Sequence, residues 1–144
     1  MSYLPEGMPI PQAESDGLSA PYWEGLRDEK ILVQRCGVCQ TWQWGPEWIC
    51  HQCLGFELQW VEVRGMGRIY TWQRSHHPVH PALREAVPYI TVLVELPDAG
   101  GIRMIGNLLG DSSQDVRVGA AVAAEFEHHT ASEPGYTLLQ WRYV

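Results

Sequence analysis

Two Cys-x-x-Cys pairs constrain this chain more than any other feature of its sequence. Cys36 and Cys39 form the first pair, and Cys50 and Cys53 follow after ten intervening residues. Four thiolates presented by two tight turns can reach one tetrahedral centre. The spacing therefore predicts a metal site, and zinc is preferred to iron because no redox partner is evident. A dithiol redox pair is the main alternative, but that chemistry needs one such motif rather than two.

With cysteine at all four positions, the predicted coordination shell is closed. A closed shell leaves no position for a substrate, so the zinc is expected to hold the fold rather than to take part in chemistry. The gap between the pairs is shorter than the roughly 15–20 residues common in zinc sites, yet it suits a small ribbon built on one hairpin. His51 lies inside the second pair and is expected to be an exposed spacer.

The net charge and the pattern of apolar residues exclude several classes of protein. The 144 residues carry a formal net charge of -7, which argues against bulk electrostatic binding of nucleic acid. No apolar run approaches the roughly 18 residues of a membrane-spanning helix. The first residues lack a basic stretch followed by an apolar one, so no secretory signal is visible. A cytoplasmic location with reduced thiols is the resulting expectation, with no membrane partner.

The pattern of the chain predicts three parts and a mainly β fold. Residues 1–29 read as a tail and a short helix, residues 30–57 as a rubredoxin-like zinc ribbon, and residues 58–144 as a barrel. The last part holds five or six strand patterns separated by Gly-rich turns, which is typical of a small closed barrel. We expect a C-terminal five-stranded OB-fold, in which Gly65 and Gly67 let the first strand bend and serve both halves.

A short helix is predicted at about residues 20–28. Ser19 can cap it, and Pro21 suits its first turn. Its apolar face either packs on the domain behind it or anchors a partner, because such aromatic residues are enriched at interface hot spots. The candidate partner-interface residues are Tyr22, Trp23 and Leu26.

One local stretch is basic. Residues 63–84 hold four Arg and three His and no acid. The clustering is either a chance feature of a solvated surface or a small anion site, since the planar fork of Arg pairs with phosphate. Tyr70 and Trp72 alternate with these residues and are expected mainly in the barrel core. A catalytic or metal role for the three His is disfavoured, because the stretch supplies no orienting carboxylate or thiol.

The order of these parts resembles the DUF35 family over about residues 19–143. The family often has Gly directly after each cysteine pair, where Gln40 and Leu54 stand here. The residues that carry the resemblance are Pro21–Leu26, the four cysteines, Gly65–Trp72, His77-Pro78, Pro88-Tyr89, Asn107–Gly110 and Val116–Gly119.

The resemblance implies a non-catalytic, acyl-CoA-associated subunit within a hetero-oligomer. Its expected partner is a thiolase-fold enzyme, first of all a lipid-transfer-protein-like retro-aldolase acting on a CoA thioester such as a steroid side-chain degradation intermediate. An acetoacetyl-CoA thiolase or a MaoC-like hydratase is the alternative partner. The chemistry would belong to the partner, and the OB-fold and ribbon would help to shape a channel for the CoA arm.

The residues themselves are compatible with this implication. Coenzyme A carries a 3′-phosphate and a pyrophosphate, so a few Arg and His would hold it. A single-stranded nucleic-acid-binding module is the rival, but residues 59–144 carry seven Arg against nine acids. An independent enzyme is the other rival, and the sequence holds none of the common nucleophile or nucleotide motifs. The candidate CoA contacts are Arg68, Trp72, Arg74, His76, His77, Arg103 and Asn107.

Overall fold

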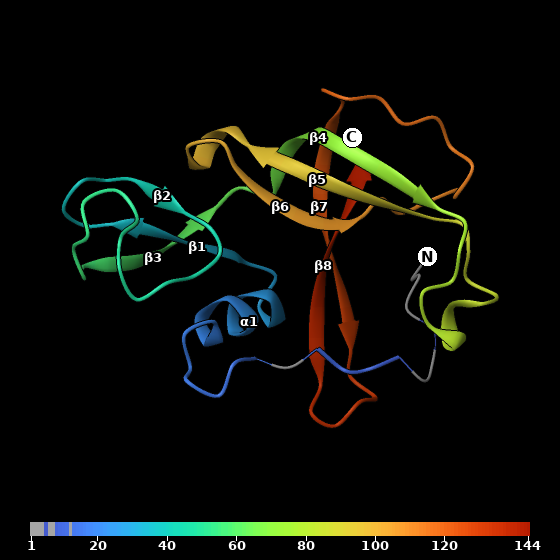
Figure 1. Cartoon of the computed structure of the whole chain (residues 1–144), viewed down its shortest axis with the longest axis horizontal. Helices are drawn as coiled ribbons and strands as arrows, with labels where there is room; N and C mark the ends of the chain where they lie inside the picture. Colours follow the sequence, from blue (N-terminus) through green and yellow to red (C-terminus); the bar gives the residue numbers. More distant parts are fainter. Residues whose placement is uncertain (1–4, 6–7, 12) are drawn as a thin grey trace.

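The computed structural model describes Pro5, residues 8–11 and residues 13–144. Figure 1 shows a small sheet on one side, a larger curved sheet on the other, and one α-helix, α1, beside both. The small sheet has the strand order β2-β1-β3, and the larger one has the order β6-β5-β4-β7-β8. The molecule is mainly β, as the sequence predicts. No helix in the described part of the chain is long and apolar enough to cross a membrane.

The single α-helix, α1, spans Ala20–Arg27, close to the predicted range. Pro21 lies in its first turn, as expected, while the Ser19 side chain makes no capping hydrogen bond. The helix ends at Arg27, and Glu29 then adopts a left-handed backbone with φ of 57°. Leu26 is fully buried, so the apolar face of α1 packs against the rest of the molecule.

The ribbon sheet is built around β1, which spans Ile31–Cys36. β1 pairs antiparallel with β2, Trp42–Gln43, on one side and with β3, Leu58–Val63, on the other. Residues 58–63, expected as a strand at the start of the barrel, form a strand that pairs within the ribbon sheet. The second cysteine turn brings the chain back along β1, so that β3 pairs with β1 along its whole length.

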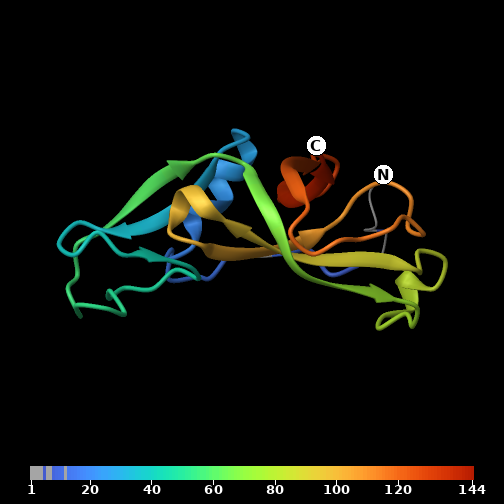
Figure 2. The ribbon, with the colours of Figure 1, turned by 90° about the horizontal axis from the view of Figure 1, so that it is seen from above.

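The barrel begins at β4, whose bend explains how five strands close. β4 pairs with β5 from Arg68 onward and with β7 as far as Arg68, with a register shift between Ile69 and Thr71. Figure 2 shows this strand curving across the molecule. Gly67 lies at the crossing, where a Cβ would come 2.7 Å from the Glu95 carbonyl oxygen. The barrel strands are β4 Met66–Ser75, β5 Tyr89–Leu96, β6 Ile102–Asn107, β7 Ala121–His129 and β8 Tyr136–Tyr143.

The seam of the barrel lies between β6 and β8. Leu108, the residue that follows β6, forms a parallel bridge with Trp141 of β8, which makes the sheet a nearly closed barrel. This confirms the predicted five-stranded OB-fold, including the shared first strand. Two short 3-10 helices lie in its loops, η1 at Pro81–Leu83 and η2 at Pro97–Ala99.

One hydrophobic core joins all three parts. β5 contributes an alternating inward row, Ile90, Val92, Val94 and Leu96, with exposures of 1% or less. The ribbon and the helix add buried side chains to the same cluster rather than forming separate cores. A ribbon of this size buries little apolar surface alone, so its attachment to the barrel stabilises both.

Candidate functional site

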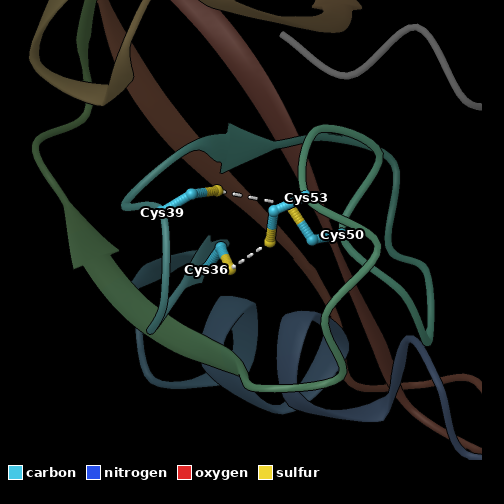
Figure 3. Close-up of side chains that lie close together, drawn as sticks. All are labelled: Cys36, Cys39, Cys50 and Cys53. Atoms are coloured by element: carbon cyan, nitrogen blue, oxygen red, sulfur yellow. Dashed lines mark hydrogen bonds between the residues drawn. The ribbon is translucent and has the colours of Figure 1, made fainter.

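The structure brings the four cysteine side chains into one cluster (Figure 3). Their Sγ atoms all lie within 4.8 Å of one another, and Cys36–Cys53 and Cys39–Cys50 are each separated by 3.6 Å between sulfurs. None is in a disulfide. Tetrahedral zinc with Zn–S bonds of about 2.3 Å requires sulfurs about 3.8 Å apart. The donor set and its spacing therefore fit zinc, and these four thiolates would fill its coordination shell.

Two matching turns create this geometry. The Gln40 N–H donates to the Cys36 carbonyl oxygen at 3.0 Å, and the Leu54 N–H donates to the Cys50 carbonyl oxygen at 2.9 Å. Gln40 and Leu54 adopt left-handed backbones with φ of 64° and 61°. Gly adopts this left-handed conformation at the least cost, so both turns carry a side chain where Gly would fit more easily.

Two buried glutamines hold the loop that carries the second cysteine pair. Gln34 donates to the Glu47 carbonyl oxygen at 3.0 Å and accepts from the Glu47 N–H at 2.9 Å. Gln43 donates to the Ile49 carbonyl oxygen and accepts from the His51 N–H. Neither residue is predicted from the sequence. The only available signal was a polar residue among apolar neighbours on predicted strands.

The thiol of Cys39 is the one best prepared to bind a cation. The Thr41 hydroxyl lies 3.2 Å from its sulfur. Hydrogen bonds from the side chain and then the backbone of Thr41 stabilise the thiolate and lower the pKa of Cys39 to about 6. Because the thiolate is the form that binds metal, this environment favours Cys39 as a ligand. His51 is exposed and hydrogen-bonds to Gln43, so it serves the loop as a spacer.

The structure separates the candidate CoA contacts. Arg74 donates to the carbonyl oxygens of Ser112 and Gln114, so its fork holds that turn rather than an open anion site. Arg68 donates to the Gly119 carbonyl oxygen at 3.2 Å. Arg103 lies on the outer face of β6, with its Cζ 3.6 Å from the Tyr70 ring centroid and its Nε 3.2 Å from Glu95 Oε2.

Tyr70 and Trp72 are 46% and 37% exposed, so the expectation of a core position for them is wrong. β4 pairs with β7 only as far as Arg68, and the barrel therefore does not close over the second half of β4. His76 and His77 are exposed beyond the end of β4.

A second candidate site is an apolar cavity of about 440 Å³ between α1 and the barrel. Of the candidate CoA contacts only Asn107 lines it, and of the candidate interface residues Tyr22 and Trp23 do. Among the described residues, no charged side chain lines it. The lining comprises Met8, Tyr22, Trp23, Val79, Leu83, Tyr89, Thr91, Ile105, Gly106, Asn107, Leu138, Leu139 and Gln140. Sequence reasoning could not assemble this cavity, because its walls come from segments far apart in the chain.

The candidate interface residues differ in how accessible they are to a partner. Leu26 is fully buried in the core, so it fixes α1 to the barrel and is not accessible to a partner. Tyr22 packs edge-on against Trp44, with 4.7 Å between ring centroids, and burial raises the pKa of Tyr22 to about 12. Tyr22 and Trp23 are half-buried and keep part of their surface open.

A four-cysteine ribbon fused to an OB-fold barrel defines a recognisable class of two-module protein. Two family models match the chain: the rubredoxin-like zinc ribbon domain of ChsH2 at residues 23–59 and the C-terminal OB-fold domain of ChsH2 at residues 60–127. The chain belongs to the DUF35 family, in the ChsH2-like form of these two domains.

Two solved structures are similar to this chain. The solved structure named Ltp2-ChsH2(DUF35) aldolase has a chain that is 30% identical, with a TM-score of 0.78, covering 93% of this chain and 98% of that one. A DUF35 protein of unknown function from Sulfolobus solfataricus shares the fold, at 18% identity and a TM-score of 0.58, covering 88% of this chain and 85% of that one.

Two curated relatives carry enzymatic names. A probable enoyl-CoA hydratase alpha subunit of Thermomonospora curvata is 32% identical over 86% of this chain and 37% of the relative. The 3-oxo-4,17-pregnadiene-20-carboxyl-CoA hydratase alpha subunit of Mycobacterium tuberculosis is 26% identical over 95% of this chain and 40% of the relative. The chain thus spans about two-fifths of the length of these relatives.

Proposed function

We propose that this chain is a non-catalytic subunit of an acyl-CoA enzyme complex. Its partner is a thiolase-fold enzyme of the lipid-transfer-protein-like aldolase type. The complex cleaves a CoA thioester by a retro-aldol reaction, and a steroid side-chain degradation intermediate is the first candidate substrate. The catalytic residues belong to the partner, while this chain binds it and contributes to the surface that receives the thioester.

One observation carries this proposal. The chain matches, over nearly all of both lengths, a chain in a solved structure that is named as an aldolase with a DUF35 component. The four-cysteine site supports the non-catalytic role, because its donor set leaves no position for a substrate.

The surface of the ribbon supports association with a partner. Large apolar side chains are exposed around the cysteine turns, and residues 36–56 contain only one charged residue, Glu47. Exposed apolar surface of this kind marks interaction sites. The side chains concerned are Val38, Trp48, Ile49, Leu54 and Phe56, which we call the ribbon tip.

Co-expression tests the proposal directly. The chain would be produced together with a lipid-transfer-protein-like thiolase-fold protein encoded beside it, and the mixture analysed by size-exclusion chromatography with light scattering. We expect a stable hetero-oligomer, and retro-aldol cleavage of a steroid CoA thioester that requires both proteins. Cleavage by the isolated chain, or full activity of the partner alone, would overturn the proposal.

A ribbon-tip variant tests where the partner binds. Phe56→Ser combined with Leu54→Ser should abolish the hetero-oligomer and leave the fold intact. Val118→Ser, on the barrel and 66% exposed, is the matched control and should leave the complex unchanged. Equal effects of the two variants would place the interface elsewhere.

A hydratase partner is the second candidate. It is favoured by the two curated relatives named as hydratase alpha subunits. The same co-expression with a MaoC-like hydratase, assayed for hydration of an enoyl-CoA, distinguishes the two partners.

A further inference from the structure

We propose that the cavity between α1 and the barrel binds the bulky apolar acyl group of the thioester, at a site separate from the one that holds the CoA phosphates. This inference rests on the proposed function and names the part of the substrate that this chain contacts. The cavity measures about 440 Å³, within the range of about 300–1,000 Å³ that ligand pockets occupy.

The chemistry of the lining excludes the nucleotide end of the ligand. None of the lining residues that the structure describes is Arg, Lys or His, so this lining offers no cation to pair with a phosphate. The walls are instead the side chains of Tyr22, Trp23, Leu83, Tyr89 and Ile105. Aromatic faces of this kind suit the flat sides of a ring system.

Two polar groups give the cavity a preference for an oxygen-bearing ligand. The Asn107 side chain donates to the Ile90 carbonyl oxygen, and its backbone N–H donates to Gln140 Oε1, which fixes its orientation. The hydrogen bonds of the Asn107 side chain use its NH2 group, so its Oδ1 can accept a further one, and the Tyr22 hydroxyl can donate or accept. A hydroxyl or carbonyl group on the acyl part would satisfy one of them.

β6 links this cavity to the candidate CoA contacts. Arg103, Ile105 and Asn107 alternate along β6, with Ile105 and Asn107 at the cavity and Arg103 beyond it beside Tyr70. At about 3.3 Å per residue, Arg103 and Asn107 are about 13 Å apart along the strand. A thioester laid along β6 would place its acyl group in the cavity and its phosphates toward Arg103.

Equilibrium dialysis of the purified chain with progesterone, a neutral oxo-steroid, tests the site without CoA. We expect saturable binding of one molecule per chain. Ile105→Trp, which fills the cavity from a position that is 67% exposed, should weaken binding at least tenfold. Val118→Trp, which is equally exposed but outside the cavity, should leave it unchanged. Arg103→Ala should leave progesterone binding unchanged and weaken the binding of CoA.

Each outcome decides the proposal. Absence of saturable binding, or equal loss in both Trp variants, would overturn it. Progesterone binding that disappears in the hetero-oligomer would show that the partner subunit fills the cavity and would also overturn it. If the hetero-oligomer forms while the chain binds no progesterone, the accessory role stands and the acyl site fails. If the chain binds progesterone but no thiolase-fold partner, the accessory role fails instead.

Discussion

Two residues at the metal site adopt an unfavourable backbone conformation. Gln40 and Leu54 hold left-handed backbones directly after the two cysteine pairs. For a residue with a side chain this conformation costs about 1–2 kcal/mol relative to the right-handed one. The turns tolerate the cost because their backbone hydrogen bonds place the cysteines, and metal binding would stabilise them further.

Replacing one of these residues with Gly should stabilise the protein. Leu54→Gly removes the steric cost and loses little packing, since Leu54 is 66% exposed. Gly also raises the conformational entropy of the unfolded chain, which opposes this effect. The expected net increase in the free energy of unfolding is about 0.5–1 kcal/mol. Thermal denaturation with saturating zinc measures it. Val38→Gly, at 60% exposure and without a positive φ, is the control and should destabilise.

Burial separates two leucines that the sequence alone does not distinguish. Leu26→Ala should lower the free energy of unfolding by about 2–5 kcal/mol, because it leaves a cavity in the core shared by helix and barrel. Leu54→Ala, at an exposed position, should change it by less than about 0.5 kcal/mol. Urea denaturation of both variants provides the comparison. Similar losses would mean that α1 does not pack on the barrel as described.

The sequence predicts some residues better than others. The four cysteines could be found because the spacing of metal ligands is local. The buried glutamines Gln34 and Gln43 could not, because their partners are backbone groups of a loop whose path depends on the metal site. Arg74 was assigned to an anion on charge alone, whereas its partners lie about 40 residues away along the chain.

Among the elements, the turn between β5 and β6 fixes the ribbon to the barrel. Gly100 in this turn has φ of 66°, and a Cβ there would lie 2.7 Å from Trp42 Cδ1 on β2. The ring of Trp42 thus packs directly on the backbone of a barrel turn. This contact joins two modules that match separate family models.

A pair of glycine substitutions isolates this contact. Gly100→Ala combines a strained backbone with a clash against Trp42. Gly119→Ala, with φ of 85° and nothing within 4 Å of the new Cβ, has the strain alone. Gly119→Ala should cost about 1–2 kcal/mol and Gly100→Ala about 1–3 kcal/mol more, measured by thermal denaturation. Equal costs would show that the ribbon moves freely relative to the barrel.

Element order was predictable and element pairing was less so. Alternating apolar residues and Gly-rich turns locate the barrel strands, because these patterns are local. The strand that pairs with β3 cannot be read from the local sequence, because residues 58–63 would suit a barrel strand equally well. They lie beside β1 only because the chain folds back after the second cysteine turn. The cavity depends on several elements at once and has no sequence signal.

At the scale of the whole molecule, the ribbon and the barrel share one core, so metal binding is coupled to the stability of the entire chain. Because metal binds only where the cysteines are brought together, its binding free energy adds to folding. We expect about one zinc per chain by mass spectrometric metal analysis.

Removing one of the four metal ligands should therefore destabilise the barrel as well as the ribbon. Cys36→Ser should lose zinc and should unfold or aggregate, because Cys36 is buried at the end of β1. A chelator should lower the melting temperature of the unmodified chain in the same direction. A zinc-free Cys36→Ser protein of unchanged melting temperature would refute the metal site.

The seam between β6 and β8 has a consequence for how the barrel fluctuates. Four strand pairs form ladders of several residues, whereas this seam is closed by a bridge between Leu108 and Trp141. Backbone amides next to such a seam exchange their hydrogens faster than those of the central strands. Asn107 and Gln140 lie on its two sides and also line the cavity. Opening of the seam would thus admit a ligand to the cavity. A bound ligand would in turn slow amide hydrogen exchange along β6.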